Sequence, residues 1–199
     1  TSVIKRRNIM PPKQQITREM IIKAGFELVR SSGEQALNVR KTASALNCST
    51  QPIMYQFASV DELKDEIYAE ADRFHTEYIM DIDSRSENPM LEIGLRYIKF
   101  AAEEKHLFRF LFQSDKYANK GFGELIGGDE LAPIFSILRG EAGISEQQSR
   151  DVFAALFLTV HGISGLLANN SMDCDEEYFK KILNDVFMGV IGMMGRENI

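Results

Sequence analysis

The chain has 199 residues, a formal net charge of −6 and 44% hydrophobic residues. This length suits one helical domain of ordinary size, or a small domain fused to a larger one. It contains no uninterrupted apolar run of 18 or more residues and no signal-peptide pattern, which predicts a cytoplasmic protein without a membrane span. Two cysteines, Cys48 and Cys174, are too few for a disulfide scaffold, and we expect both to be reduced.

The charge is distributed unevenly along the chain. Residues 1–60 contain nine Lys or Arg and three Asp or Glu, whereas residues 61–199 contain fourteen and twenty-six. A basic block ahead of an acidic body predicts that one part contacts a polyanion and the rest does not; the alternative is a chance asymmetry.

Residues 1–14 have no hydrophobic period and contain two prolines and the basic cluster Lys5-Arg6-Arg7. We interpret them as a flexible basic arm. The arm either reaches towards DNA phosphates or the minor groove, or has no function because Met10 is the native initiator.

Residues 15–60 are predicted to form a three-helix head. Thr17 is the expected N-cap of the first helix, which ends at Gly33. Small residues at Ala24 and Gly25 are expected to let another helix approach this helix closely.

Residues 38–57 have the pattern of a helix-turn-helix motif, whose second helix enters the DNA major groove. Asn38 is the expected N-cap of the first helix of the motif. Asn47 tolerates the left-handed conformation that a helix end needs, and Ser49 is expected to cap the next helix, with Pro52 in its first turn. Any small helical bundle contains such pairs, so the pattern alone leaves a plain helical interpretation open.

Residues 61–199 are predicted to form a larger helical body. A capping box from Ser59 to Glu62 starts a fourth helix that runs to about residue 83 and spans roughly 30 Å, long enough to link two bodies. No alternating strand pattern is present, so the sequence predicts an all-α protein of about nine helices. The remaining helices are expected from Asn88-Pro89, over 106–113 and 131–139 with a stop at Gly140, from a second capping box at Ser145 to Gln148, and from Asp173 or Asp175, with a loop over 114–130.

This order of elements, together with the residues at eleven positions between 17 and 63, resembles the TetR family of bacterial transcription regulators. Residues 96–112 with Val160-His161-Gly162 are similar to one subgroup, usually recognised by Trp-His-Gly in the C-terminal domain. The resemblance implies a DNA-binding head and a body that binds a small molecule and forms a homodimer. It is densest over 17–63, at Ile21, Ala24, Gly33, Val39, Arg40, Ala43, Leu46, Ser49, Phe57, Ser59 and Leu63.

The chain departs from the pattern of that family at three positions. Asn47 stands where the family often has Gly, Met54 where it has Tyr, and Val60 where it has Lys. The Tyr and the Lys usually contact DNA phosphates, and we expect Tyr55 and Lys64 to substitute from neighbouring positions.

Candidate DNA-binding residues follow from this assignment. Arg40 and Lys41 begin the helix that crosses the DNA backbone, so we expect phosphate contacts there; solvated charges are the alternative. The recognition helix has no Arg or Lys, so base contacts would depend on Thr50, Gln51 and Gln56. The Tyr55 hydroxyl is expected to donate to a phosphate; the alternative is that this ring packs on the first helix. The full set of candidates is Asn38, Arg40, Lys41, Ser49, Thr50, Gln51, Tyr55, Gln56 and Lys64.

The body is expected to contain a ligand site and a dimer interface. Its fifth to eighth helices are rich in Phe, which suits a small hydrophobic or aromatic effector. The last two helices have wide apolar faces with several glycines, which predicts a homodimer through them; an ordinary monomer core is the alternative. The candidate ligand residues, each of which is otherwise a core residue, are Phe100, Phe108, Phe112, Phe157 and His161.

The three histidines have no metal-ligand spacing, and no motif for a cofactor or for catalysis is recognised. We therefore interpret the chain as a sequence-specific transcriptional regulator, a ligand-released repressor that binds a palindromic double-stranded DNA operator as a dimer. The alternative is a helical small-molecule binding protein without specific DNA binding, which the missing cations of the recognition helix favour. A helical enzyme is a second alternative.

Overall fold

The computed structural model describes residues 15–114, 128 and 131–194, and all regular elements within these ranges are helical. They confirm the prediction of an all-α protein with about nine helices. The elements are α1 (Arg18–Ser32), the 3-10 helix η1 (Glu34–Ala36), α2 (Val39–Ala45), α3 (Gln51–Gln56), α4 (Val60–Met80), α5 (Pro89–Glu103), α6 (Lys105–Phe112), α8 (Ala132–Ala142), α9 (Glu146–Asn169) and α10 (Glu176–Met194).

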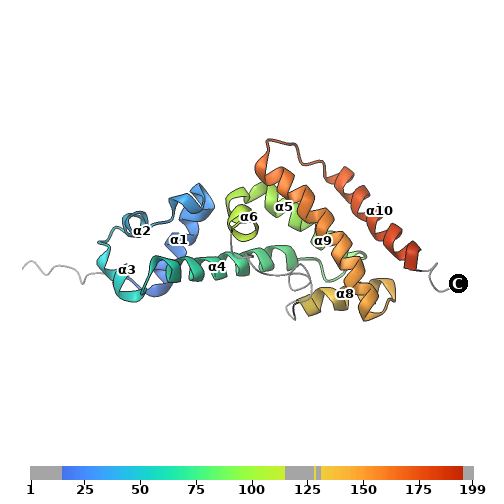
Figure 1. Cartoon of the computed structure of the whole chain (residues 1–199), viewed down its shortest axis with the longest axis horizontal. Coiled ribbons are helices and arrows are strands. Elements are labelled where there is room, and N and C mark those ends of the chain that lie inside the picture. The colour runs from blue at the N-terminus through green and yellow to red at the C-terminus, as the bar shows by residue number, and fades with distance from the viewer. Residues whose placement is uncertain (1–14, 115–127, 129–130, 195–199) are drawn as a thin grey trace, which may run out of the picture.

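The molecule is elongated, with a small head formed by α1, α2 and α3 at one end and a body formed by α5 to α10 at the other (Figure 1). Helix α4 belongs to both parts, because it packs against α1 near its start and against α5 and α6 further along. Its 21 residues correspond to about 30 Å of helix, as the sequence predicted.

Local capping chemistry sets the helix boundaries of the head. The Thr17 side chain accepts a hydrogen bond from the Met20 N–H, and Asn38 accepts one from the Lys41 N–H at 2.9 Å. Asn47 adopts a positive φ of 50°, which ends α2 as expected. The expected cap at Ser49 is wrong: Thr50 is the N-cap residue of α3, and its own helical angles leave no side-chain cap hydrogen bond.

The head is fixed to α4 by close packing and by one arginine. Gly25 of α1 faces Ile67 of α4 so closely that a Cβ atom at position 25 would lie 2.2 Å from the Ile67 Cδ1 atom. This confirms the expected close helix approach. The Arg18 guanidinium contacts the carboxylates of Glu62 (2.9 Å) and Glu66 (2.8 Å) and lies over the Phe57 ring.

The capping box that begins α4 is only half formed. Ser59 accepts from the Glu62 N–H as expected, but the Glu62 carboxylate accepts from the N–H of Ala58 at 2.6 Å instead of that of Ser59. Because the same carboxylate also contacts Arg18, it ties the start of α4 to α1.

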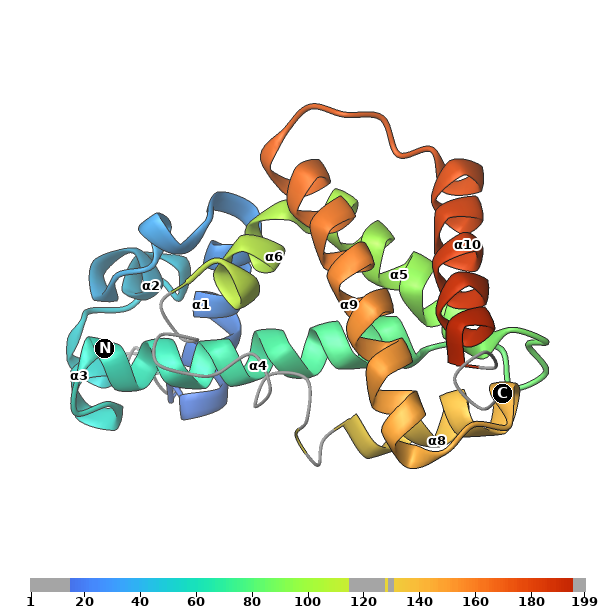
Figure 2. The same cartoon turned by 45° about the vertical axis from the view of Figure 1, so that its right-hand side comes forward.

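Helix α9 is the centre of the body and packs against α5, α6, α8 and α10 (Figure 2). By length and apolar composition it is the one described helix that would fit a membrane span. Its residues Val152, Leu156, Val160 and Leu167 are buried in the protein core instead.

Two boundaries in the body differ from the sequence predictions. Helix α4 ends at Met80, and α8 continues past Gly140 to Ala142, because Gly143, with a φ of 64°, is the residue that ends it. The predicted start of the last helix near Asp175 is confirmed: α10 begins at Glu176, and the Asp175 carboxylate accepts from the Tyr178 N–H at 3.0 Å. The capping box at Ser145 is complete. The predicted arm over 1–14 and most of the predicted loop over 114–130 lie outside the described residues.

Candidate DNA-binding surface and ligand cavity

Helix α3 presents an exposed face that points away from the rest of the head. Ile53 and Phe57 are 1% and 2% exposed and anchor α3 in the core. Thr50 and Gln51 are exposed at its start, and Tyr55 is 90% exposed. Tyr55 is therefore not packed on α1, which was the alternative interpretation.

Two cations at the start of α2 lie beside this helix in the motif. Arg40 and Lys41 are both exposed, and neither forms an ion pair with any residue that the structure describes. The Asn38 side chain is engaged in the cap, and its amide also donates to the Ala36 carbonyl oxygen at 3.4 Å. Two cationic side chains are thus available for an external anion.

Two other candidates are engaged inside the head. The side-chain amide of Gln56 donates to the Ile16 carbonyl oxygen at 2.6 Å, and the Gln56 backbone oxygen accepts from Arg18 at 2.6 Å. The Lys64 ammonium is paired with the Glu34 carboxylate of η1. Both residues position elements of the head in this structure, whereas Ser49 is exposed on the turn.

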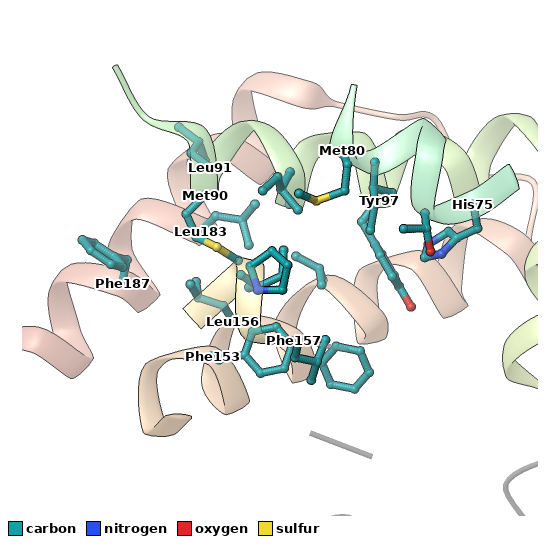
Figure 3. A pocket seen from close by; sticks show the side chains of 18 of the residues that line it. His75, Met80, Met90, Leu91, Tyr97, Phe153, Leu156, Phe157, Leu183 and Phe187 are labelled. Atoms are coloured by element: carbon teal, nitrogen blue, oxygen red, sulfur yellow. The ribbon is translucent and has the colours of Figure 1, made fainter. Parts of the chain in front are cut away.

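A cavity of about 570 Å³ lies in the body, between α4, α5, α6, α8, α9 and α10. Its size is within the usual range for small-molecule sites. In Figure 3, His75 and Tyr97 lie towards one end, and Met90, Leu91, Leu183 and Phe187 lie towards the other. The remaining lining is largely apolar, with Met80, Ile93, Phe153, Leu156 and Val160 among its residues.

The structure places the five candidate ligand residues differently. Phe112 and Phe157 line the cavity. Phe100 and Phe108 are completely buried and lie outside its lining. His161 also lies outside the lining; its Nδ1 atom is 3.0 Å from the Tyr97 hydroxyl, and burial lowers its pKa.

Sequence reasoning missed the contribution of α4 to the cavity. The lining includes Tyr68, Asp72, His75, Thr76 and Ile79, a spacing that keeps these side chains on one side of α4. The spacing of these residues is visible in the sequence, but most of them are polar, so they do not form a recognisable apolar stripe. Among the described residues, no group of three or more His, Cys, Asp and Glu is placed to hold a metal ion.

The head and body with these surfaces form the fold of TetR-like regulators. Similar solved structures include the transcriptional regulator SCO7222, a TetR from Streptomyces coelicolor, with a TM-score of 0.65 and 18% identity over 89% of this chain and 98% of that chain. A single-residue variant of TetR from Acinetobacter baumannii AYE in complex with minocycline has a TM-score of 0.57 and 14% identity, over 91% of this chain and 97% of that one. Searches of protein-family models and of curated proteins found no match.

Proposed function

We propose that this protein is a sequence-specific DNA-binding transcriptional regulator, a repressor that a small hydrophobic or aromatic ligand releases from a palindromic operator. The observation that carries the proposal is the exposed face of α3 next to the unpaired cations of α2. The likeness to the two regulators named above supports it. The site of action would be cytoplasmic.

The exposed side chains divide into two roles. Arg40, Lys41 and the Tyr55 hydroxyl would contact phosphates and set the orientation of the head on the duplex. Thr50 and Gln51 would contact base edges, Gln being suited to adenine and Thr to a thymine methyl group. Asn38 and Ser49 lie where the backbone of the duplex would pass, and Gln56 and Lys64 would act indirectly by positioning α3 and α4.

Binding of the purified protein to fragments of its own upstream DNA at two salt concentrations tests this proposal. Tight binding to one palindromic fragment is expected to fall steeply with salt. The double variant Arg40→Ala and Lys41→Ala should weaken binding and reduce the slope of log affinity against log salt by roughly 0.9 for each phosphate that the variant no longer neutralises.

The control variant removes the same charge from the body. Arg85→Ala with Lys99→Ala changes two exposed cations outside the head and should leave operator affinity unchanged. Weak binding that is equal on all fragments and is the same in both variants would contradict the regulator. It would favour the alternative, a small-molecule binding protein without specific DNA binding, which the absence of Arg and Lys from α3 motivates.

The faces of α9 and α10 support a homodimer. Leu158 and Leu166 of α9 and Met188 and Met193 of α10 are more than half exposed, and only Leu183 of α10 is buried. Nothing within 4 Å covers the open positions next to them, at Gly162, Gly165, Gly189 and Gly192. Two copies joined through these helices would place two recognition helices about 34–36 Å apart, as successive major grooves require.

Two helices connect the cavity to the head. Residues of α4 and Phe112 at the end of α6 line the cavity, and both helices pack against α1. Arg30 of α1 holds the Glu104 carboxylate, directly before α6, with two Nε contacts of 3.0 and 3.1 Å. A ligand that favours another arrangement of α4 and α6 would therefore change the head spacing, by no more than its differential affinity for the two states.

A further inference from the structure

His75 is the polar group of the cavity that lacks a partner in the protein. Among the described residues, four buried side-chain nitrogen or oxygen atoms have no hydrogen-bond partner, and of the four residues that hold them only His75, through its Nε2 atom, is a residue of the cavity lining. The His75 side chain is 6% exposed. In the same lining, the hydroxyls of Tyr68 and Tyr97 are hydrogen-bonded, to the Leu111 carbonyl oxygen and to His161, at 3.0 Å each.

Aromatic rings enclose the imidazole and hold it in place. The ring centroids of Phe100, Phe112 and Tyr97 lie 4.8, 5.1 and 5.2 Å from that of His75, and all three contacts are edge-on. These rings offer the Nε2 atom no strong hydrogen bond. A buried polar atom without a partner is unfavourable, so a ligand that supplies one gains affinity from it.

Away from His75 the lining is mainly apolar, although it includes Glu141, whose carboxylate accepts from the Met90 N–H at 2.9 Å. His75 lies towards one end of the cavity, and the side chains of Met90, Leu91, Leu183 and Phe187 lie towards the other (Figure 3). An occupant that fills the cavity would therefore have a predominantly apolar body and one polar group at the end near α4.

The neutral state of the His75 imidazole restricts which polar group a ligand can place beside it. Burial lowers the pKa of His75 to about 4, so the imidazole is neutral at pH 7 and has one donor and one acceptor nitrogen. A hydroxyl group both donates and accepts, and it therefore pairs with Nε2 in either tautomer. A carboxylate suits the cavity less well, because Asp72 and Glu141 are already in the lining and burial raises the pKa of Glu141.

We infer that the cavity takes a neutral amphiphile, an apolar or aromatic body with a hydroxyl group hydrogen-bonded to the Nε2 atom of His75. The inference deepens the proposed function, because this molecule would be the effector. A ligand without the hydroxyl would leave the same atom without a hydrogen bond.

Calorimetric titration of the full-length protein with three matched probes tests the inference. The probes are para-hexylphenol, its methyl ether para-hexylanisole, and para-hexylbenzoate. We expect the phenol to bind about tenfold more tightly than the ether, because a net hydrogen bond has roughly this effect on an equilibrium constant. The benzoate should bind more weakly than the phenol.

Variants of His75 and of a histidine outside the cavity identify the atom responsible. In His75→Phe the preference for the phenol over the ether should disappear, while the ether still binds. His75→Gln retains a hydrogen-bonding group and should keep part of the preference, which guards against a folding defect in the first variant. His106→Gln changes a histidine that is not part of the lining; it is the matched control and should keep the full preference.

Equal affinities for the phenol and the ether, a preference for the benzoate, an unchanged preference in His75→Phe, or no binding of any probe would each overturn the inference. These measurements contain no DNA. A failure here therefore leaves the operator experiment unaffected, and a failure of operator binding leaves the phenol preference to stand as a property of the cavity.

Discussion

The imidazole of His75 is kept neutral by burial, and this predicts a pH dependence of stability. In the unfolded chain the group titrates near 6.5, whereas in the folded protein its pKa is about 4. Between these values only the unfolded state binds the proton, so the free energy of unfolding falls as the pH is lowered from 6.5 towards 4. The total effect is at most about 3 kcal/mol.

Urea denaturation between pH 7 and pH 4.5 measures this effect. The titratable groups that share the cavity lining with His75 are Tyr68 and Asp72 of α4, Tyr97 of α5 and Glu141 of α8. His75→Gln should flatten the profile in this window, whereas His106→Gln, which changes a histidine outside the cavity, should not. Parallel profiles for wild type and His75→Gln would show that burial of this imidazole does not determine the acid sensitivity.

The exposure of a single residue was predictable from the sequence where a short helix has a clear inner face. Tyr55 follows the outward face of a short helix whose inner face, Ile53 and Phe57, is clear from the spacing. Gln56 and Lys64 bind partners 40 and 30 positions away in the sequence, Ile16 and Glu34. No local pattern identifies such a partner, so these two residues were assigned to DNA instead of to the head.

At the level of elements, the close packing of α1 on α4 depends on the absence of a side chain at Gly25. Gly25→Ala would place a methyl group 2.2 Å from the Ile67 Cδ1 atom and 3.0 Å from its Cγ1 atom. Overpacking of this kind costs about 1–3 kcal/mol, and the higher helix propensity of Ala offsets up to about 1 kcal/mol. We expect a net destabilisation, measured as a lower midpoint of denaturation.

A second substitution and a control test the cause. Ile67→Val removes the Cδ1 atom, so the double variant with Gly25→Ala should be more stable than the sum of the two single effects. Gly140→Ala in α8 meets nothing within 4 Å and should stabilise by about 0.5–1 kcal/mol. Additive effects at positions 25 and 67 would show that this contact is not the source of the strain.

The boundaries of elements were predictable where a few consecutive residues determine them. The caps at Thr17, Asn38 and Ser145 depend on hydrogen bonds to atoms three residues away, and the sequence located all three. The end of α8 was wrong because two glycines, Gly140 and Gly143, are equally good signals and only the second has a positive φ. The cavity was predicted only in outline, because six helices enclose it and their relative placement is not a local property.

At the scale of the whole molecule, one chain leaves an apolar stripe on each of α9 and α10 uncovered. The exposed apolar side chains and the open glycines of α9 and α10 recur three or four positions apart, which places them along one stripe of each helix. Both helices lie on the same side of the body (Figure 1). The head, with its exposed α3, lies at the far end of α4, so a second copy joined through α9 and α10 would leave both recognition helices accessible.

The substitutions Leu166→Glu and Met188→Glu therefore test the homodimer. Each places a charge on an exposed apolar position, 55% and 65% exposed, where burial against a partner would be costly for a carboxylate. Sedimentation equilibrium should show a dimer for wild type and a monomer for the double variant, with unchanged helicity. Operator affinity should fall about 100-fold or more, because the second half-site no longer binds intramolecularly.

Ser136→Glu puts the same charge on an exposed position of α8 and should alter neither property. If the double variant stayed dimeric, the interface would have to lie elsewhere; if it became monomeric and kept full operator affinity, one head would suffice and the palindrome would lose its physical basis.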